Sequence, residues 1–275
     1  MLLDLHTHTQ PLSYDSFLPP DELIERSKQA GLDGIVLSEH DAAWSPDAVK
    51  ELSKRHNFLV LPGMEINTEE GHMLVYGMHK YVFGMHRVHE LAGHVDNVNG
   101  LMIQAHPYRR QHPWNWESEK EWIHSLERSE ANNALNFVRG LEVLNGRGKL
   151  NENQFSKILA DHIGMPGTAG TDSHMTDDIG KCVTYFEKDI TNEEDLIEAL
   201  RNGLYWPIDM TKGDVTPDTR YWDVPSDLRQ IFEDLNNRPK HLEKSIEQQE
   251  LLRIQAASTS VELIKSLKKE ADTTG

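Results

Sequence analysis

The sequence has little cysteine, few positive charges and no long apolar run. Its 275 residues include one cysteine, Cys182, so the chain can form neither an internal disulfide framework nor a zinc site of thiolates. No apolar run approaches the roughly 18 residues that a membrane-spanning helix needs. Residues 1–6 lack the basic and apolar regions of a signal peptide. We therefore expect a cytoplasmic protein with no membrane partner.

Positive charge is scarce as well. Lys and Arg total 28 against 45 Asp and Glu, which gives a formal net charge of −17. Such a chain repels the phosphates of a duplex, so we expect no duplex nucleic acid as a partner. The sequence also has no Gly-rich phosphate loop of the nucleotide-binding kind. What it has instead is an apolar fraction of 37%, ample for a core, and 15 histidines among its many acids.

Short apolar runs alternate with helical patterns along the first two hundred residues. Helix signals are Pro19-Pro20 before two acids, Ser45-Pro46, and a capping box at residues 191–194. This alternation predicts an α/β protein with a parallel sheet, open or closed into a barrel. The predicted strands are residues 2–5, 34–37, 58–61, 73–76, 101–103, 140–144 and 167–170.

Histidines and carboxylates recur where these predicted strands end, which favours a barrel because barrels assemble their sites at the ends of several strands. The first strand ends at His6-Thr7-His8, and residues i and i+2 of an extended chain point to the same side. Asp172 and His174 repeat this spacing after the run at 167–170. Five further candidates lie between the two pairs: Asp15, His40, Glu65, His72 and His106.

These nine residues predict a metal centre. Imidazole and carboxylate without thiolate suit Zn, Mn, Fe and similar divalent ions. Nine side chains exceed what one ion takes from a protein, but they fit two or three ions with a bridging carboxylate and open positions for water and substrate. Carboxylates gathered in one pocket would also repel each other unless cations lay between them.

In their order along residues 1 to about 210, seven short motifs resemble those of the polymerase and histidinol phosphatase (PHP) family. They are His6-Thr7-His8, Ser13-Tyr14-Asp15-Ser16, Ser38-Glu39-His40-Asp41, Gly63-Met64-Glu65, Gly71-His72-Met73-Leu74, Ala105-His106-Pro107 and Gly170-Thr171-Asp172-Ser173-His174. The resemblance implies a distorted, seven-stranded (β/α) barrel with a trinuclear metal site. It implies a first ion held by His6, His8, Glu65 and Asp172, a second by Asp15, His40 and His174, and a third by His72, His106 and a bridging Glu65.

The sequence departs from the family pattern at three points. Glu39 precedes His40 where the family usually has Thr-Asp-His, which affects the support of the ligands and not the ligands themselves. Tyr14-Asp15-Ser16 stands where Ser-Asp-Gly is frequent in the family, so the conformation of this loop can differ from the family's. His79 lies seven residues after His72 and is an alternative ligand, although the motif favours His72.

The expected activity is hydrolysis of a small phosphorylated substrate, a nucleotide or another phosphomonoester, by attack of a metal-bound hydroxide. The nine residues would act through the bound metal. Arg109 and Arg110 follow the Ala105-His106-Pro107 motif and are candidates for binding the phosphate, with Arg147 and Lys149 as second candidates. Trp114 and Trp116 lie in the same long loop, where packing is favoured over stacking on a ring of the substrate.

Three other functions compete with this one. The family includes exonucleases, so action on short oligonucleotide ends is the main alternative. An amidohydrolase-type barrel also begins with His-x-His, but it commonly uses a strand-end lysine that has no counterpart here. A metal-binding scaffold with a lost activity is disfavoured because all nine candidate ligands are present.

The last part of the chain has a different pattern. Residues 240–274 contain neither Pro nor Gly and repeat apolar residues at three- and four-residue spacing, which predicts an amphipathic helix. We expect this helix to pack on the barrel, with self-association as the alternative. The predicted organisation is therefore a PHP-like phosphoesterase domain over residues 1–212 and a C-terminal helical tail over residues 213–275.

Overall fold

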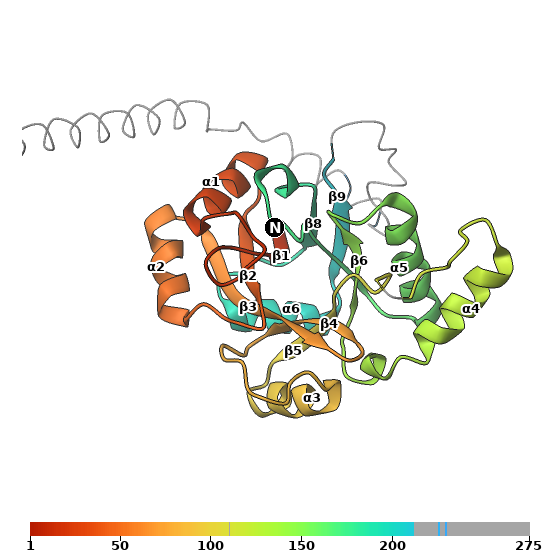
Figure 1. The fold of residues 1–275 in the computed structure, drawn as a ribbon. Coiled ribbons are helices and arrows are strands. Elements are labelled where there is room, and N and C mark those ends of the chain that lie inside the picture. The colour runs from red at the N-terminus through yellow and green to blue at the C-terminus, as the bar shows by residue number, and fades with distance from the viewer. Residues whose placement is uncertain (110, 212–224, 226–228, 230–275) are drawn as a thin grey trace, which may run out of the picture. The chain divides into compact units, whose positions relative to one another are not determined.

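Nine strands form one sheet that curls into a nearly closed barrel in the computed structural model (Figure 1). The structure describes residues 1–109 and 111–211, together with Pro225 and Arg229. Apart from those last two residues, the predicted helical tail at 213–275 lies outside the described residues. Within the described ranges, no helix is both long and apolar enough to cross a membrane.

The strand order is β7-β6-β5-β4-β3-β2-β1-β8-β9, and β4 and β8 run antiparallel to their neighbours. The strands are β1 (Leu2–Thr7), β2 (Gly34–His40), β3 (Leu59–Thr68), β4 (Gly71–Tyr76), β5 (Leu101–Gln104), β6 (Leu141–Asn145), β7 (Gly167–Gly170), β8 (Cys182–Phe186) and β9 (Tyr205–Asp209).

The expected strand count of seven is therefore wrong for the described chain, although all seven predicted strands are present. The missed strands are β8 and β9. β9 carries Pro207 and ends at Asp209, residue types that weaken a strand signal. β8 is rich in strand-forming residues, and its signal was overlooked. Pro207 is tolerated because β9 pairs only with β8 and ends the sheet order. The expectation of an all-parallel sheet is corrected too, by the two antiparallel strands.

Helices cover the outside of the sheet. Figure 1 shows α1 and α2 beside β2 and β3, α3 next to β5, and α5 along β6. The helices are α1 (Pro20–Ala30), α2 (Pro46–His56), α3 (Val88–Asn97), α4 (Glu119–Glu130), α5 (Leu150–Ile163) and α6 (Glu193–Asn202).

Local sequence signals set the helix ends. Pro20 begins α1, and Gly31 ends it in the left-handed region with a φ of 88°. The Ser45 side chain caps α2 by accepting from the Ala48 N–H, as its sequence predicts. The capping residue of α6 is Asn192, whose side chain accepts from the Asp195 N–H, so the predicted box is displaced by one residue.

The sheet has a hydrophobic core on each face, because successive residues of a strand point to opposite sides. Leu74 of β4 and Ile103 of β5 pack with Leu196 of α6 in one cluster. Their neighbours Met73 and Met102 belong to a second cluster, which includes residues of α3 and α5. Burial on both faces explains why the strands appear in the sequence as nearly continuous apolar runs.

The barrel closes between β7 and the β1–β8 pair by side-chain and loop hydrogen bonds. The Thr184 hydroxyl of β8 donates to Ala169 O (2.8 Å) and accepts from Ala169 N (2.9 Å). Cys182 is buried next to this seam, where its Sγ donates to Gly170 O (3.1 Å), so it is a packed side chain as expected. Burial raises the pKa of the Cys182 thiol well above its usual value.

We expect Thr184→Val to lower the free energy of unfolding by about 1–3 kcal/mol, because it leaves both backbone groups of Ala169 buried and unpaired. Urea denaturation measures the change. Thr184→Ser keeps the hydroxyl and should retain most of the stability. Equal stability of Thr184→Val and wild type would show that the seam does not depend on this hydroxyl.

Candidate metal centre

All nine predicted side chains lie at one end of the barrel. His6 and His8 stand at the end of β1, His40 ends β2, and Glu65 lies in β3. His72 comes from the start of β4; because β4 is antiparallel, its start lies at the same end of the barrel as the ends of β1 to β3. The remaining four residues come from loops: Asp15 after β1, His106 after β5, and Asp172 and His174 after β7.

The Glu65 carboxylate lies at the centre of this cluster. Its Oε1 is 2.8 Å from His72 Nδ1 and 2.9 Å from His106 Nε2. Its Oε2 is 2.9 Å from His40 Nδ1 and 3.3 Å from the Nε2 atoms of both β1 histidines. Burial would raise the pKa of Glu65, but the charge of His6 and hydrogen bonds from neighbouring imidazoles hold it well below its usual value. Glu65 is therefore an ionised carboxylate that reaches five imidazoles.

Asp172 approaches the same histidines from the other side of the seam. Its Oδ1 lies 3.3 Å from His8 Nε2 and 3.7 Å from His6 Nε2, and these two nitrogens are 2.9 Å apart. Burial would raise the pKa of Asp172, but the His6 charge and the His8 hydrogen bond lower it well below its usual value. Two imidazole nitrogens about 3 Å apart fit ligands of one ion, because each lies about 2 Å from a metal such as zinc.

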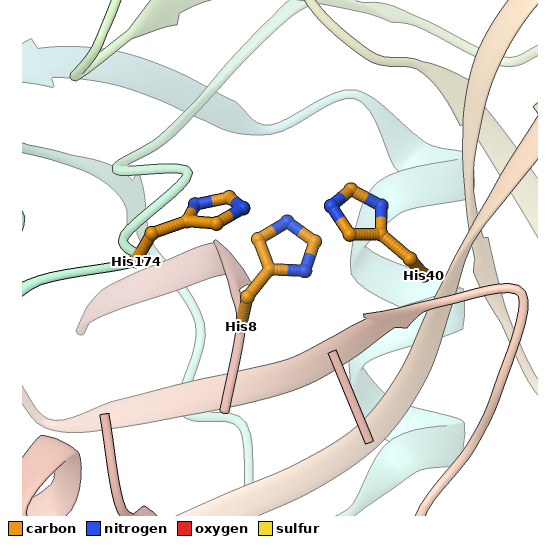
Figure 2. A group of neighbouring side chains, drawn as sticks. All are labelled: His8, His40 and His174. Atoms are coloured by element: carbon orange, nitrogen blue, oxygen red, sulfur yellow. The ribbon is translucent and has the colours of Figure 1, made fainter. Parts of the chain in front are cut away.

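A second group forms around His8, His40 and His174, whose rings converge from three segments (Figure 2). The His8 ring centroid lies 4.1 Å from that of His40 and 4.4 Å from that of His174. Asp15 Oδ2 adds a carboxylate 3.4 Å from His40 Nε2 and 3.3 Å from His174 Nε2.

The cluster leaves polar atoms without partners, which is the observation that tests its fit to metal ions. Four of its buried atoms make no hydrogen bond of regular geometry within the described part of the chain: Asp15 Oδ1, Glu65 Oε2, Asp172 Oδ1 and His174 Nε2. Polar atoms of the cluster approach three of them, at 2.9–3.3 Å, without forming such a bond. An unpaired buried polar atom costs about 1–3 kcal/mol, and a divalent cation removes that cost. Among the described residues, three predicted ligands meet in each of three groups: His8/His40/His174, His6/His8/Asp172 and Glu65/His72/His106. The residues therefore fit a metal centre with nitrogen and oxygen ligands.

Hydrogen bonds behind the cluster fix which nitrogen faces it in three of the imidazoles, those of His6, His8 and His174. His6 Nδ1 lies 2.9 Å from Glu142 Oε1, an acceptor, so this nitrogen carries the proton and Nε2 is the nitrogen that faces the cluster. His8 Nδ1 lies 3.2 Å from Ser13 Oγ, whose own hydroxyl donates to Glu39. His174 Nδ1 lies 2.8 Å from Asp172 O. In each case Nε2 points toward the cluster.

Glu142 is the residue that the sequence analysis missed. It is buried, and besides His6 it contacts the backbone N–H of His106 and Nδ2 of Asn145 through Oε2, at 2.9 and 3.0 Å. It also forms a fourth possible ligand group with His6 and His106. The signal was present, because an acid between Leu141 and Val143 interrupts an otherwise apolar strand.

Glu39 holds the loop that carries Asp15. It is fully buried and accepts from Thr9 N (2.8 Å), Ser13 Oγ and Trp44 Nε1 (2.8 Å). Asp15 follows Ser13 by two residues. Glu39, which stands where the family pattern has Asp, therefore keeps a carboxylate at this position, and this carboxylate anchors the first loop.

Two guanidinium groups contact side chains of the cluster, Arg109 at atoms that face it and Arg147 at the nitrogen of His174 that faces away from it. Arg109 Nη2 donates to Asp172 Oδ2 (2.6 Å), and its Nη1 lies 3.0 Å from His106 Nε2. Burial would lower the pKa of Arg109, but Asp172 raises it. Arg147 Nη1 lies 2.8 Å from His174 Nδ1. Of the other candidates, Arg110 lies outside the described residues and Lys149 is the N-cap residue of α5.

The remaining candidates, His79, Trp114 and Trp116, differ in their contacts. His79 Nε2 lies 2.7 Å from Glu193 Oε2, so it is His72 and not His79 that meets Glu65. Trp116 stacks on His112 and accepts at its carbonyl from Trp122 Nε1, which agrees with a packing role. Trp114 is 88% exposed, so packing does not explain it.

We expect Glu142→Gln to weaken metal binding about 10- to 100-fold, because the amide no longer holds the His6 ring with a negative charge. Competition with a chromophoric chelator measures the affinity. Glu193→Gln is the matched control, since it changes a glutamate–histidine pair away from the cluster and should leave the affinity unchanged. An unaltered affinity in Glu142→Gln would contradict a role in orienting His6.

Comparisons with known proteins agree with this arrangement. A family model described as the PHP domain matches residues 4–139, and one described as PHP-associated matches residues 151–204. The first segment contains seven of the nine candidate ligands, and the second contains Asp172 and His174. No curated protein matches the chain.

Similar folds occur among solved structures. PsfC from Pseudomonas syringae is 17% identical, with 79% of this chain and 92% of that chain covered and a TM-score of 0.51. An amidohydrolase from Chromobacterium violaceum, solved with sulfate and no metal, is 14% identical. The match covers 76% of this chain and 98% of that chain, with a TM-score of 0.50. A provisionally named metal-dependent phosphoesterase from Bifidobacterium adolescentis is 18% identical. The match covers 72% of this chain and 95% of that chain, with a TM-score of 0.48. The two family models together span most of the described residues, and the chain belongs to the PHP family.

Proposed function

We propose that this protein is a metal-dependent phosphoesterase that hydrolyses a small phosphorylated substrate. Membership of the PHP family and the cluster of imidazoles and carboxylates support a metal-dependent hydrolase. The observation that carries the proposal further is the set of buried carboxylate oxygens on Asp15, Glu65 and Asp172 that lack a regular hydrogen bond. The Arg109 guanidinium group contacts Asp172, and Arg147 lies behind the His174 ring. That combination suits cations and an anionic substrate together.

The proposed ligand sets are those implied by the family resemblance: His6, His8, Glu65 and Asp172; Asp15, His40 and His174; and His72, His106 and Glu65. Two or three divalent ions, Zn, Mn or Fe, would supply an activated water molecule and positive charge for the phosphoryl oxygens. Glu65 supports ions shared between sets, because its two oxygens face different histidines.

The protein's own groups would bind and orient the phosphate. Guanidinium groups favour phosphate because their N–H donors match two oxygens at once. Arg109 is tied to Asp172 by one nitrogen, so its position follows that of a proposed ligand. Hydrolysis then adds the water oxygen to phosphorus and breaks the bond from phosphorus to the alcohol oxygen, and the alcohol leaves with a proton from the water. The two arginines favour this reaction over amide hydrolysis, which has no anionic centre of that kind in its substrate.

Removing the metal should abolish phosphate release from a phosphomonoester, and adding Zn or Mn should restore it. Asp172→Asn should lose at least about 100-fold in kcat, together with bound metal, because it removes a negative ligand from the centre. Elemental analysis and a phosphate-release assay on monoesters and short oligonucleotides measure both. Asp195→Asn, at the start of α6, is the control. Full turnover by the metal-stripped protein would refute the proposal.

Arg109→Lys should raise KM for the phosphoester about 10-fold or more while the metal content stays constant, because a single ammonium cannot reproduce the two-pronged contact. Arg87→Lys changes an exposed arginine at the start of α3 and serves as the control. An unchanged KM in Arg109→Lys would assign phosphate binding to another group.

A further inference from the structure

Gln104 is a buried amide whose carbonyl oxygen has no hydrogen-bond partner among the described residues. The residue is 2% exposed and ends β5, where its N–H donates to Gly140 O (3.2 Å). Met102, two residues earlier on the same face of the strand, packs in the hydrophobic cluster. An apolar side chain at position 104 would avoid the cost of an unpaired amide, so its presence needs a reason.

A cavity of about 290 Å³ supplies that reason. Its lining includes Gln104, the ligand candidates His72 and His106, and Arg109. Both histidines contact Glu65 Oε1, and Arg109 contacts Asp172. The cavity therefore adjoins the metal centre on the side where β4 and β5 meet. Its volume lies at the low end of the roughly 300–1,000 Å³ found for ligand pockets, which suits a small compound.

Gly71 lines the same cavity next to the amide. It stands at the start of β4 with a φ of 127°, a conformation that residues with side chains rarely adopt. A Cβ built at this position would contact Gln104 Nε2 at 3.5 Å. The absence of a side chain at position 71 thus leaves space in the cavity next to the amide.

We propose that this cavity binds the alcohol part of the phosphoester and that Gln104 is a specificity-determining residue, which selects an alcohol with a further hydroxyl group. The inference rests on the proposed phosphoesterase function. A hydroxyl both donates and accepts, so it can pair with either end of the amide. An ammonium group would be repelled by Arg109, and a purely apolar alcohol would leave the amide unpaired.

The test compares two esters that differ only in hydroxyl groups, glycerol 3-phosphate and n-propyl phosphate, on the metal-loaded full chain. Wild type should favour glycerol 3-phosphate by at least 10-fold in kcat/KM, because a site built to pair with a hydroxyl discriminates against a substrate without one. Gln104→Leu should reduce this preference to about twofold or less, chiefly by lowering kcat/KM for glycerol 3-phosphate. Gln29→Leu, on the half-buried side of α1, should keep the wild-type preference.

A binding measurement separates this inference from the function on which it rests. Calorimetry compares the binding of 3,4-dihydroxybutylphosphonate with that of butylphosphonate. Neither compound can be hydrolysed at phosphorus, because a carbon–phosphorus bond replaces the ester bond. If no ester is hydrolysed but wild type still binds the dihydroxy compound 10-fold more tightly and Gln104→Leu does not, the phosphoesterase function is wrong and the subsite stands.

The opposite result overturns the subsite alone. If wild type hydrolyses both esters equally, or if Gln104→Leu keeps the wild-type preference, Gln104 does not select the alcohol and the phosphoesterase function remains. The leucine variant should unfold at the same temperature as wild type or higher, because it replaces an unpaired amide by an apolar group of similar size. If it fails to fold, Gln104→Met provides the same comparison.

Discussion

The closure of the sheet between β1 and β7 is the constraint on which the candidate metal centre depends. It joins two segments that are more than 160 residues apart in the sequence. Asp172 N donates to His6 O (2.8 Å), and His8 N donates to Ser173 O (3.1 Å). Asp4 adds a buried carboxylate that accepts from Thr171 N (2.9 Å). These backbone bonds fix the two segments side by side. The pair His6 and His8 therefore faces the pair Asp172 and His174.

Electrostatics explain why this arrangement calls for cations. Burial raises the pKa of a carboxyl group, and it brings that of Asp4 to about 7 even though hydrogen bonds from Thr171 and His6 act to lower it. Glu65 and Asp172 are equally buried, yet their pKa values are well below the usual range because imidazoles surround them. The same carboxylates raise the pKa of His8 to about 9 against the effect of burial. Protons on the imidazoles and divalent ions are thus two ways of balancing one set of charges, and metal binding displaces the protons.

The sequence predicted the main features of the fold and the membership of the cluster. All seven expected strands exist, and all nine expected residues meet, because strand ends in a barrel converge whatever the loops between them do. β8 and β9 were missed because their pattern depends on partners distant in sequence, such as Ala169 for Thr184. Glu142 and Gln104 were missed for a related reason: each is a polar residue in a buried strand, and only the fold shows what it faces. For the same reason the sequence placed Glu39 among the groups that support the ligands without showing which loop it holds.

The order of the ligands along the chain has a consequence for biosynthesis. His6 is made early, but its partners Asp172 and His174 follow only after seven strands have been synthesised, and the seam forms only once Thr184 has emerged. Because domains fold as units during synthesis, the complete ligand set does not assemble until the chain has been made past Thr184. Metal capture is then confined to the finished domain, and the ion that it acquires is set by the free metal pools of the compartment in which folding ends.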